Sequence, residues 1–397
     1  MKVFFCFWRG AVVFFAILLA VHVSHATNAK TAPRRSTAKQ TRVSENRKAR
    51  RNLSRLRHHR RVATRRRYSQ RYRTSSFAND ATEGDITEGE DPIVRAAAVD
   101  ALGNMNGTVV AIEPSTGRIL AMVNQKLALS AGAQPCSTIK IPVALAAIEE
   151  GIVDKDTEIQ VGRRSSISMT EALAHSNNPY FEALGRKLGF KKVQYYSHLF
   201  GLGELAGYQI DGEQRGVYPA KEIPARLGGV GKMCSFGEGV SMTPLQLGAL
   251  TAALANGGTL YYLQHPESPD EVEDFQPRSK RHLDLTNVLP EIRDGMLGAV
   301  HYGTARHLRT SFTEEEVLGK TGTCSHAGTR FGWFASYADA SADSRDVVVV
   351  VFLRGGRPTF GPKAAEIAGR VYRNLYDHSF FTARAAEGTS AVPVDRR

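Results

Sequence analysis

The distribution of apolar and polar residues divides the chain into three parts. A run of apolar residues covers 10–23, whereas residues 32–73 are mostly Arg, Ser, Thr and Lys with few aliphatic side chains. A segment of that second composition cannot bury enough apolar surface to fold, so we expect it to be disordered. From residue 93 to about residue 378, apolar positions recur at the spacings of helices and strands, which predicts a folded region.

Within the folded region, apolar runs predict strands near both ends and helices between them. Helical periodicity dominates 137–256, and a last helix is predicted over 363–376. The five predicted strands cover 107–112, 118–123, 316–323, 330–337 and 346–353. This order predicts an α+β fold, in which an antiparallel five-stranded sheet is flanked by helices and carries an inserted all-helical subdomain.

The first apolar run has the features of an export signal. Lys2 and Arg9 precede it, and Ser24-His25-Ala26 follows it, which puts small residues at the two positions that a signal peptidase reads. A membrane-spanning helix needs roughly 20 apolar residues, and this run is shorter. We therefore expect residues 1–26 to be a signal peptide, and the rest to be exported to the periplasm or another extracytoplasmic space. Retention of the segment as an anchor in the inner (cytoplasmic) membrane stays open.

The formal charge of +13 is concentrated in one segment. Residues 27–75 hold 18 Lys and Arg residues against one acidic residue, whereas residues 76–397 carry a net charge of −6. We expect this basic arm to bind anionic membrane lipids or an anionic envelope polymer. Tyr68 and Tyr72 could instead stack on nucleic-acid bases, but an exported chain rarely meets nucleic acid, so none is expected as a partner.

These patterns together predict five segments. They are a signal peptide or membrane anchor (1–26), a disordered Arg- and Lys-rich arm (27–75), an acidic linker (76–91), the folded domain (92–380) and a disordered tail (381–397).

Three short motifs follow one another in the folded region: Ser137-Thr-Ile-Lys140, Ser176-Asn-Asn178 and Lys320-Thr-Gly322. A single Ser-x-x-Lys match is weak, because about one is expected by chance in a chain of this length. Residues 36–39 of the basic arm contain such a match. The match at Ser137 differs because an apolar stretch follows it, with Pro142 suited to a first helical turn, which predicts a buried helix starting near Ser137.

This predicted helix gives the first motif a possible chemistry. Positions i and i+3 share one helical face, so Lys140 is expected beside the Ser137 hydroxyl. Lysine normally titrates near 10.4, and a base that works near neutrality must have its pKa lowered by about 3. Apolar neighbours and a second cation, Lys320, are expected to lower it. The pair then fits an activated serine, although an ordinary core helix explains this motif equally well when it is considered alone.

The second motif falls in a turn between two predicted helices. A capping box at 168–171 opens the first helix, and Asn178 caps the second, which begins at Pro179. In that turn Ser176 can relay a proton, and Asn178 can donate to the carbonyl of a substrate amide. A pair of helix caps is the plainer interpretation; it explains Asn178 well and Ser176 less well.

The third motif ends an apolar strand. Gly322 lets a substrate backbone approach the strand edge, and Thr321 and Thr323 offer hydroxyls to a carboxylate. The backbone N–H groups of Thr323 and Ser137 can together form an oxyanion hole. A glycine turn in a hairpin is the alternative for this motif alone.

The set of three motifs in this order resembles the transpeptidase domain of penicillin-binding proteins, within the serine D,D-peptidase and β-lactamase superfamily. The resemblance extends over about 92–378 and includes further stretches at 107–122, 236–246, 255–258, 303–305 and 332–334. It implies that Ser137 is the acylated nucleophile, Lys140 its general base and Ser176 a proton shuttle. The implied substrate-binding residues are Asn178, Lys320, Thr321, Gly322 and Thr323.

The resemblance also implies the reaction and its partners. Ser137 would attack the carbonyl before the terminal D-alanine of a peptidoglycan stem peptide, release that D-alanine and pass the acyl group to an amine or to water. Penicillins and other β-lactams would acylate the same serine. Neither a cofactor nor a metal is needed, and the histidines show no ligand spacing. The sequence leaves transpeptidation and carboxypeptidation open.

Two other functions compete with this interpretation. A serine β-lactamase, similar to class D, shares the acylation step, but Asn178 and the lack of a Glu-x-x-x-Asn motif between Ser176 and Lys320 disfavour it. A β-lactam sensor or wall-binding protein without turnover is the second alternative. No apolar run after the first approaches 18 residues, which disfavours the membrane-spanning segments that usually adjoin such sensors.

The cysteines allow two interpretations. Cys136 and Cys324 adjoin the first and third motifs, which converge in the resembled family, so a disulfide at the rim of the active site is one hypothesis. The default expectation is that these two and Cys234 are small buried hydrophobic residues. An odd number of cysteines remains after signal cleavage, so at least one is free or pairs between molecules.

Overall fold

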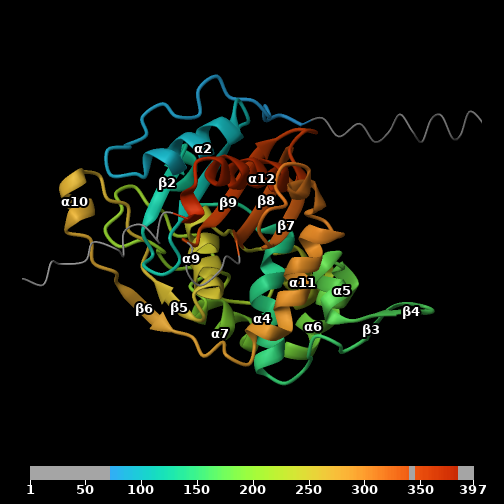
Figure 1. Ribbon diagram of the computed structural model, residues 1–397. Coiled ribbons are helices and arrows are strands. Elements are labelled where there is room, and N and C mark those ends of the chain that lie inside the picture. The colour runs from blue at the N-terminus through green and yellow to red at the C-terminus, as the bar shows by residue number, and fades with distance from the viewer. Residues whose placement is uncertain (1–71, 339–344, 383–397) are drawn as a thin grey trace, which may run out of the picture. The chain divides into compact units, whose positions relative to one another are not determined.

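The computed structural model describes residues 72–338 and 345–382 (Figure 1). The predicted signal peptide, nearly all of the basic arm and nearly all of the predicted tail lie outside the described residues. The chain divides into a unit of Met1–Ser69 and a unit of Gln70–Arg397, and the fold below belongs to the second. Within the described ranges, no helix combines the length and the apolar character needed to cross a membrane.

A five-stranded antiparallel sheet forms the centre of this unit, in the order β2-β1-β9-β8-β7. Its strands are β1 (Gly107–Ile112), β2 (Ile119–Val123), β7 (Val317–His326), β8 (Thr329–Ala338) and β9 (Val348–Gly355). All five predicted strands are present, and the predicted α+β class is confirmed. β7 continues beyond its predicted end to a hairpin turn, where Ala327 and Gly328 have φ values of 48° and 79°.

Helices cover both faces of this sheet (Figure 1). Along β9, Val349 and Val351 pack in the cluster that includes α12 (Gly361–Asp377) and α2 (Pro92–Leu102). The alternate residues Val348 and Val350 pack in the larger cluster with the helical region. A strand buried on both faces is continuously apolar instead of alternating, which explains the run of valines in β9.

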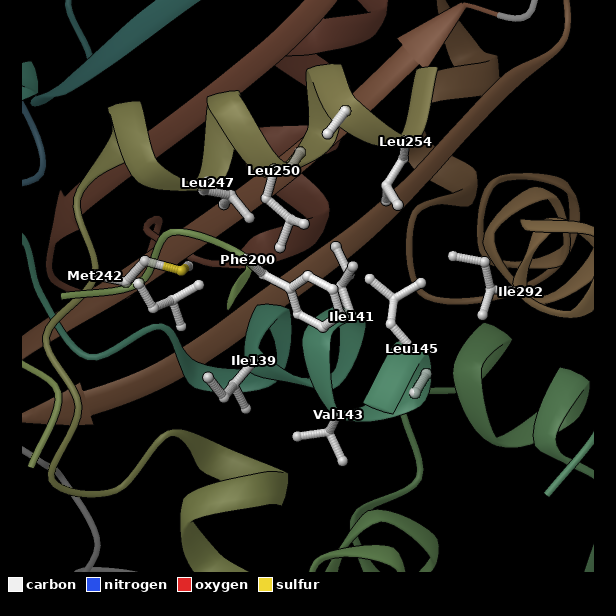
Figure 2. Close-up of a cluster of buried hydrophobic side chains, with 14 of the residues drawn as sticks. Ile139, Ile141, Val143, Leu145, Phe200, Met242, Leu247, Leu250, Leu254 and Ile292 are labelled. Carbon is white, nitrogen blue, oxygen red and sulfur yellow. The ribbon is translucent and has the colours of Figure 1, made fainter. Parts of the chain in front are cut away.

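The second cluster lies between the sheet and the helices of the inserted region. In Figure 2, Leu247, Leu250 and Leu254 of α9 (Pro244–Ala255) lie above Ile141 and Leu145 of α4 (Lys140–Glu149). Every residue of α9 from its first to its eleventh is buried, so this helix has no polar face. The packing fixes α4, and therefore the side chain at its first residue, against a rigid core.

The inserted region is less purely helical than predicted. Besides α4 and α9 it contains two short two-stranded sheets. One pairs β3 (Ile159–Gly162) with β4 (Ser165–Ile167), and the other pairs β5 (Thr259–Tyr261) with β6 (Ser279–His282). The remaining elements are α3 (Gln125–Ala128), η1 (Cys136–Ile139), α5 (Met169–Ala174), α6 (Asn178–Leu188), α7 (Phe190–Leu199), η2 (Ala225–Leu227), α8 (Gly229–Phe236), α10 (Pro269–Glu273), α11 (Leu289–His301), η3 (Arg306–Thr310) and η4 (Phe380–Thr382).

The acidic segment at 76–91, which the sequence suggests is a linker, makes specific buried contacts. Arg95 of α2 binds Asp85 at 2.7 Å and Glu90 at 3.2 Å, and both carboxylate side chains are at most 2% exposed. Glu90 also accepts from the backbone N–H of Met122 and lies 3.0 Å from His265. Acidic residues are usually exposed to solvent unless they have a buried partner. Here the partners come from distant parts of the chain, so the local composition does not reveal them.

Candidate active site

Ser137 lies in the short 3₁₀ turn η1, immediately before α4. The N–H and the hydroxyl of Thr138 both donate to the backbone oxygen of Pro135, which closes this turn. Pro142 lies in the first turn of α4, where the missing N–H of proline costs little. The helix therefore starts close to Ser137 as predicted, and Ser137 is half-buried while Lys140 is completely buried.

The ammonium nitrogen of Lys140 joins the first motif to the second. Its Nζ lies 3.0 Å from Ser137 Oγ, 3.0 Å from Ser176 Oγ, 2.7 Å from the Ser176 backbone oxygen and 2.6 Å from Asn178 Oδ1. The backbone and amide oxygens can only accept, so they take two N–H groups. In the neutral amine, the lone pair is then left for a serine hydroxyl. This geometry allows Lys140 to accept a proton from Ser137.

Burial lowers the pKa of Lys140 well below its usual range, and the charge of Lys320 lowers it further, while Glu182 opposes the shift. Burial also lowers the pKa of Lys320 to about 7. The expectation that apolar surroundings and a second cation depress the pKa of Lys140 matches these causes. The ring of Phe181, 5.5 Å from Lys140 Nζ, weakly favours the charged form.

Ser176 occupies a backbone conformation that residues other than glycine rarely adopt. Its φ is 56°, in the turn between α5 and α6, and this conformation directs both its backbone oxygen and its hydroxyl to Lys140. A left-handed φ at a non-glycine residue costs on the order of 1 kcal/mol and is common where function requires it.

The predicted cap of α6 is one residue out of register. The side chain of Asn177, rather than Asn178, accepts from the N–H of Tyr180 at 2.9 Å. Asn178 is thereby free to point its Oδ1 at Lys140. Ser168 caps α5 through the N–H of Glu171, as predicted. Asn177 therefore makes the capping contact of α6, and Asn178 makes the contact with Lys140.

The third motif lies on β7, at the edge of the sheet. Lys320 is completely buried, and its Nζ donates to the backbone oxygen of Thr321 at 3.1 Å. Thr321 Oγ1 donates to Thr304 Oγ1 at 2.6 Å, and Thr323 Oγ1 accepts from the N–H of Gly361 at 2.7 Å. Both threonine hydroxyls are thus already oriented by neighbouring loops.

The structure gives a further reason for glycine at position 322, besides the predicted approach of a substrate. A Cβ added at Gly322 would lie 2.8 Å from the backbone oxygen of Pro135 and 3.3 Å from a methyl carbon of Thr138. Only glycine lets β7 approach η1 this closely without a shift of the backbone. The third motif therefore lies directly against the turn that carries Ser137.

A disulfide joins Cys136 to Cys324, with their Cα atoms 5.5 Å apart. The hypothesis of a rim disulfide is therefore confirmed, and the default expectation of buried free thiols is wrong for these two residues. It holds for Cys234, which is free and buried, and burial raises the pKa of its thiol. The default was wrong because a disulfide depends on two positions 188 residues apart in the sequence.

Comparison with known proteins identifies the family of this domain. The family model described as penicillin binding protein transpeptidase domain matches residues 107–377. The chain belongs to this family. The resemblance drawn from the three motifs is thereby confirmed.

Two relatives and one solved structure illustrate how this chain compares with known proteins. Stage V sporulation protein D of Bacillus subtilis is 29% identical over 316 residues, which cover 67% of this chain and 48% of that protein. Peptidoglycan D,D-transpeptidase MrdA of Acinetobacter baumannii is 26% identical over 370 residues, which cover 74% and 54%. The chain spans about half the length of these two relatives. The crystal structure of Pseudomonas aeruginosa PBP2 in complex with WCK 5153 shares the fold, with a TM-score of 0.59, 24% identity and coverage of 77% and 78%.

Gln134 is a structural residue of this domain that the motifs did not indicate. Its backbone oxygen accepts from Trp333 Nε1 at 3.0 Å, and its side chain donates to the backbone oxygen of Phe236 and to Glu238. The stretch beginning at Phe236 matched the family, but no chemistry drew attention to position 134. Gln134 anchors the segment that leads into Ser137.

A cavity of about 500 Å³ lies next to this anchor. Its lining includes Gln134, Glu238, Phe331 and Arg354, together with His326 at the end of β7. Phe331 and Phe352 contribute apolar side chains to the lining, and Glu238 and Arg354 contribute charged ones. His326 is exposed at the end of β7 and lines this cavity, so a substrate could touch it there.

Proposed function

We propose that the domain is a serine D,D-transpeptidase that acts on peptidoglycan stem peptides through an acyl-enzyme on Ser137. The observation that carries the proposal is the position of Lys140 Nζ, buried and within 3.0 Å of the hydroxyls of both Ser137 and Ser176. The names of the relatives, which include peptidoglycan D,D-transpeptidases, support the same activity.

In the proposed acylation, neutral Lys140 takes the proton of Ser137 Oγ, and Oγ bonds to the carbonyl carbon before the terminal D-alanine. Negative charge develops on the carbonyl oxygen, where the N–H groups of Ser137 and Thr323 stabilise it. As the intermediate collapses, the C–N bond breaks, and the proton passes from Lys140 through Ser176 to the departing amine. The products are an ester on Ser137 and free D-alanine.

The acyl group is then transferred by the reverse sequence of proton movements. An acceptor amine of a second stem peptide gives its proton to the Ser176 and Lys140 pair and attacks the ester carbon. Lys140 returns a proton to Ser137 Oγ as the ester bond breaks. Water in place of the amine would give D-alanine removal without cross-linking.

The proposed substrate contacts follow from which atoms remain available. Asn178 Oδ1 faces Lys140, so its amide nitrogen can donate to a carbonyl of the substrate. The Thr323 oxygen accepts from Gly361, so its O–H is available for the terminal carboxylate, whereas Thr321 must give up its bond to Thr304 before it can donate there. The charge of Lys320 favours that anion. Gly322 keeps the edge of β7 open for the substrate backbone. β-Lactams present a reactive amide to the same atoms and would acylate Ser137.

We also propose that the domain acts outside the cytoplasmic membrane. The apolar N-terminal segment with its small-residue cleavage pattern supports export. A disulfide such as Cys136–Cys324 persists in oxidising compartments, which supports the same location. Binding of the basic arm to anionic lipid or polymer, and any membrane anchor, remain predictions about residues outside the described ranges.

A single labelling experiment tests the proposal. The purified domain is incubated with a fluorescent penicillin, with Ser137→Ala as control, and label retention is followed alongside D-alanine release from a pentapeptide. We expect label that depends on Ser137, persists for many minutes and is accompanied by D-alanine release. Label that does not depend on Ser137 overturns the proposal. Rapid loss of label would instead indicate a β-lactamase, and stable label without D-alanine release a sensor.

A further inference from the structure

We propose that the Cys136–Cys324 disulfide positions the two oxyanion donors of Ser137 and Thr323 for acylation. Cys136 immediately precedes Ser137, and Cys324 immediately follows Thr323, so the bond connects the two chain segments next to both N–H groups. The inference rests on the proposed function, because it concerns the rate of the acylation step at that same site.

The backbone before Ser137 needs an external constraint. Cys136 has a φ of 54°, a left-handed value that costs a residue with a Cβ on the order of 1 kcal/mol. A free chain would relax away from this conformation, and the peptide group that it orients is the one that carries the Ser137 N–H. Cys136 itself is fully buried, so its Sγ and backbone are fixed together by the bond and the packing.

Sheet hydrogen bonds do not supply this constraint. β7 is the edge strand of the sheet and pairs with β8. η1 lies outside this sheet, so no strand pairing joins it to β7. The contacts that hold residues 134–139 against β7 and β8 include the close approach at Gly322, the bond from Trp333 Nε1 of β8 to the Gln134 oxygen, and the disulfide. Of these, the disulfide alone is covalent and acts next to both donors.

The bond should affect catalysis more than binding. Charge on the carbonyl oxygen is largest in the transition state, so misplaced oxyanion donors slow acylation more than they weaken the first complex. Loss of one such donor costs on the order of 10²–10³ in rate, and small displacements cost part of that. The disulfide is therefore a positioning element and does not itself touch the reacting atoms.

The test compares two variants that both lack the disulfide but differ in the backbone preference at position 136. Cys136→Ala with Cys324→Ser leaves a residue that avoids positive φ, whereas Cys136→Gly with Cys324→Ser leaves one that tolerates it. Cys234→Ala, which removes the free buried thiol of α8 and leaves the disulfide intact, is the matched control. For each protein, the first-order rate constant of acylation and the dissociation constant of the initial complex are measured with the fluorescent penicillin.

We expect the acylation rate constant to fall about 10-fold or more in the alanine pair, with the dissociation constant changed less than about 3-fold. The glycine pair should recover a large part of the rate, and Cys234→Ala should acylate like the native protein. A first-order rate constant does not depend on the folded fraction, so general destabilisation cannot imitate this pattern. Native rate constants in both disulfide-free variants, or equal losses in the two, overturn the inference.

A second measurement serves if a variant fails to fold. The native protein is treated with excess dithiol, which forms two protein thiols as the reagent closes to its cyclic disulfide, and is desalted without air. Thiol counting verifies two additional thiols, and we expect slower acylation that recovers on reoxidation. Unchanged acylation after verified reduction would contradict the inference. Loss of Ser137-dependent labelling in the untreated protein would instead contradict the proposed function itself.

Discussion

Two clusters of buried charge in this domain differ in what faces the cation. In the N-terminal ion cluster, Arg95 lies between the carboxylates of Asp85 and Glu90. At the proposed active site, Lys140 faces neutral oxygens and has a second buried lysine, Lys320, in its surroundings. The first arrangement compensates a permanent charge and fixes the chain. The second disfavours the charge and leaves a proton acceptor beside a hydroxyl.

The comparison shows that burial alone does not decide the role of a basic residue. A guanidinium cannot lose its proton in a protein, so a buried arginine requires carboxylates. A lysine can become neutral, and its pKa falls when carboxylates are absent. The four predictions that follow test this difference, beginning with the largest expected effect.

The largest effect is expected from Lys140→Ala. Acylation of Ser137 by penicillin should slow by about 10³–10⁴, because the general base is lost. The free energy of unfolding should stay the same or rise, since burying a lysine with a lowered pKa costs stability at neutral pH, where the unfolded chain holds the proton. Stopped-flow labelling and urea unfolding measure the two quantities. Lys140→Arg, which keeps a permanent charge, should be as slow as the alanine variant, and rapid acylation by it would contradict the assigned role.

The opposite result is expected at the N-terminal ion cluster. Arg95→Met leaves Asp85 and Glu90 buried without their cation, so unfolding should become easier by about 3–5 kcal/mol. The acylation rate constant of the folded fraction should remain native. Urea unfolding with Arg95→Lys as the charge-retaining control separates loss of the ion pair from loss of packing. A destabilisation below about 1 kcal/mol would show that the acidic segment is not held by these contacts.

A pH series sharpens the contrast through Lys320, whose folded-state pKa of about 7 lies below the unfolded value of 10.5. Between these values the unfolded chain binds the extra proton, so the contribution of Lys320 to stability rises with pH through this window. Lys320→Met should be more stable than the native protein at pH 6, on the order of 1–3 kcal/mol, and the gap should shrink toward pH 10.

Urea midpoints measured across this range test the prediction about Lys320. Lys126→Met, at an exposed position, is measured alongside as the control for removing a lysine. A gap between Lys320→Met and the native protein that stays constant from pH 6 to pH 10 would exclude a depressed pKa for Lys320.

The smallest effect concerns the two adjacent asparagines. Asn177→Ala removes the cap of α6 and should cost about 1 kcal/mol of stability with near-native acylation. Asn178→Ala keeps the cap, removes the Oδ1 contact of Lys140, and should slow acylation instead. Thermal unfolding and labelling of both variants test this division. Equal changes in both measurements for the two variants would argue against it.

Local patterns in the sequence predict much of this domain. Apolar runs identify all five sheet strands, whereas the convergence of the three motifs is expected only from the family resemblance. Helical periodicity places Lys140 beside Ser137, since the i to i+3 spacing holds even though the turn at Ser137 is 3₁₀ rather than α. These successes share one property, which is that neighbours in sequence determine them.

The features that the sequence does not reveal depend on distant contacts. The left-handed φ of Cys136 is accompanied by a bond to a residue 188 positions away, and no local signal specifies it. Asp85 finds partners in the backbone of Asn124 and Gln125, so its charge alone suggests a solvated linker. The cap of α6 is ambiguous by one residue because two asparagines precede Pro179.

The pairing of β1 with β9 has a consequence for how the protein is made. Gly107 pairs with Leu353, so the central pair of strands cannot form until most of the chain has emerged. Such distant pairing slows folding, because loop-closure entropy must be overcome before the contacts form. Ser137 and Lys140 are synthesised early, yet β7, which completes their surroundings, comes about 180 residues later. A partly synthesised or partly exported chain therefore carries the proposed nucleophile without the proposed oxyanion donor of Thr323, and under the proposed mechanism acylation begins only when the whole domain has folded.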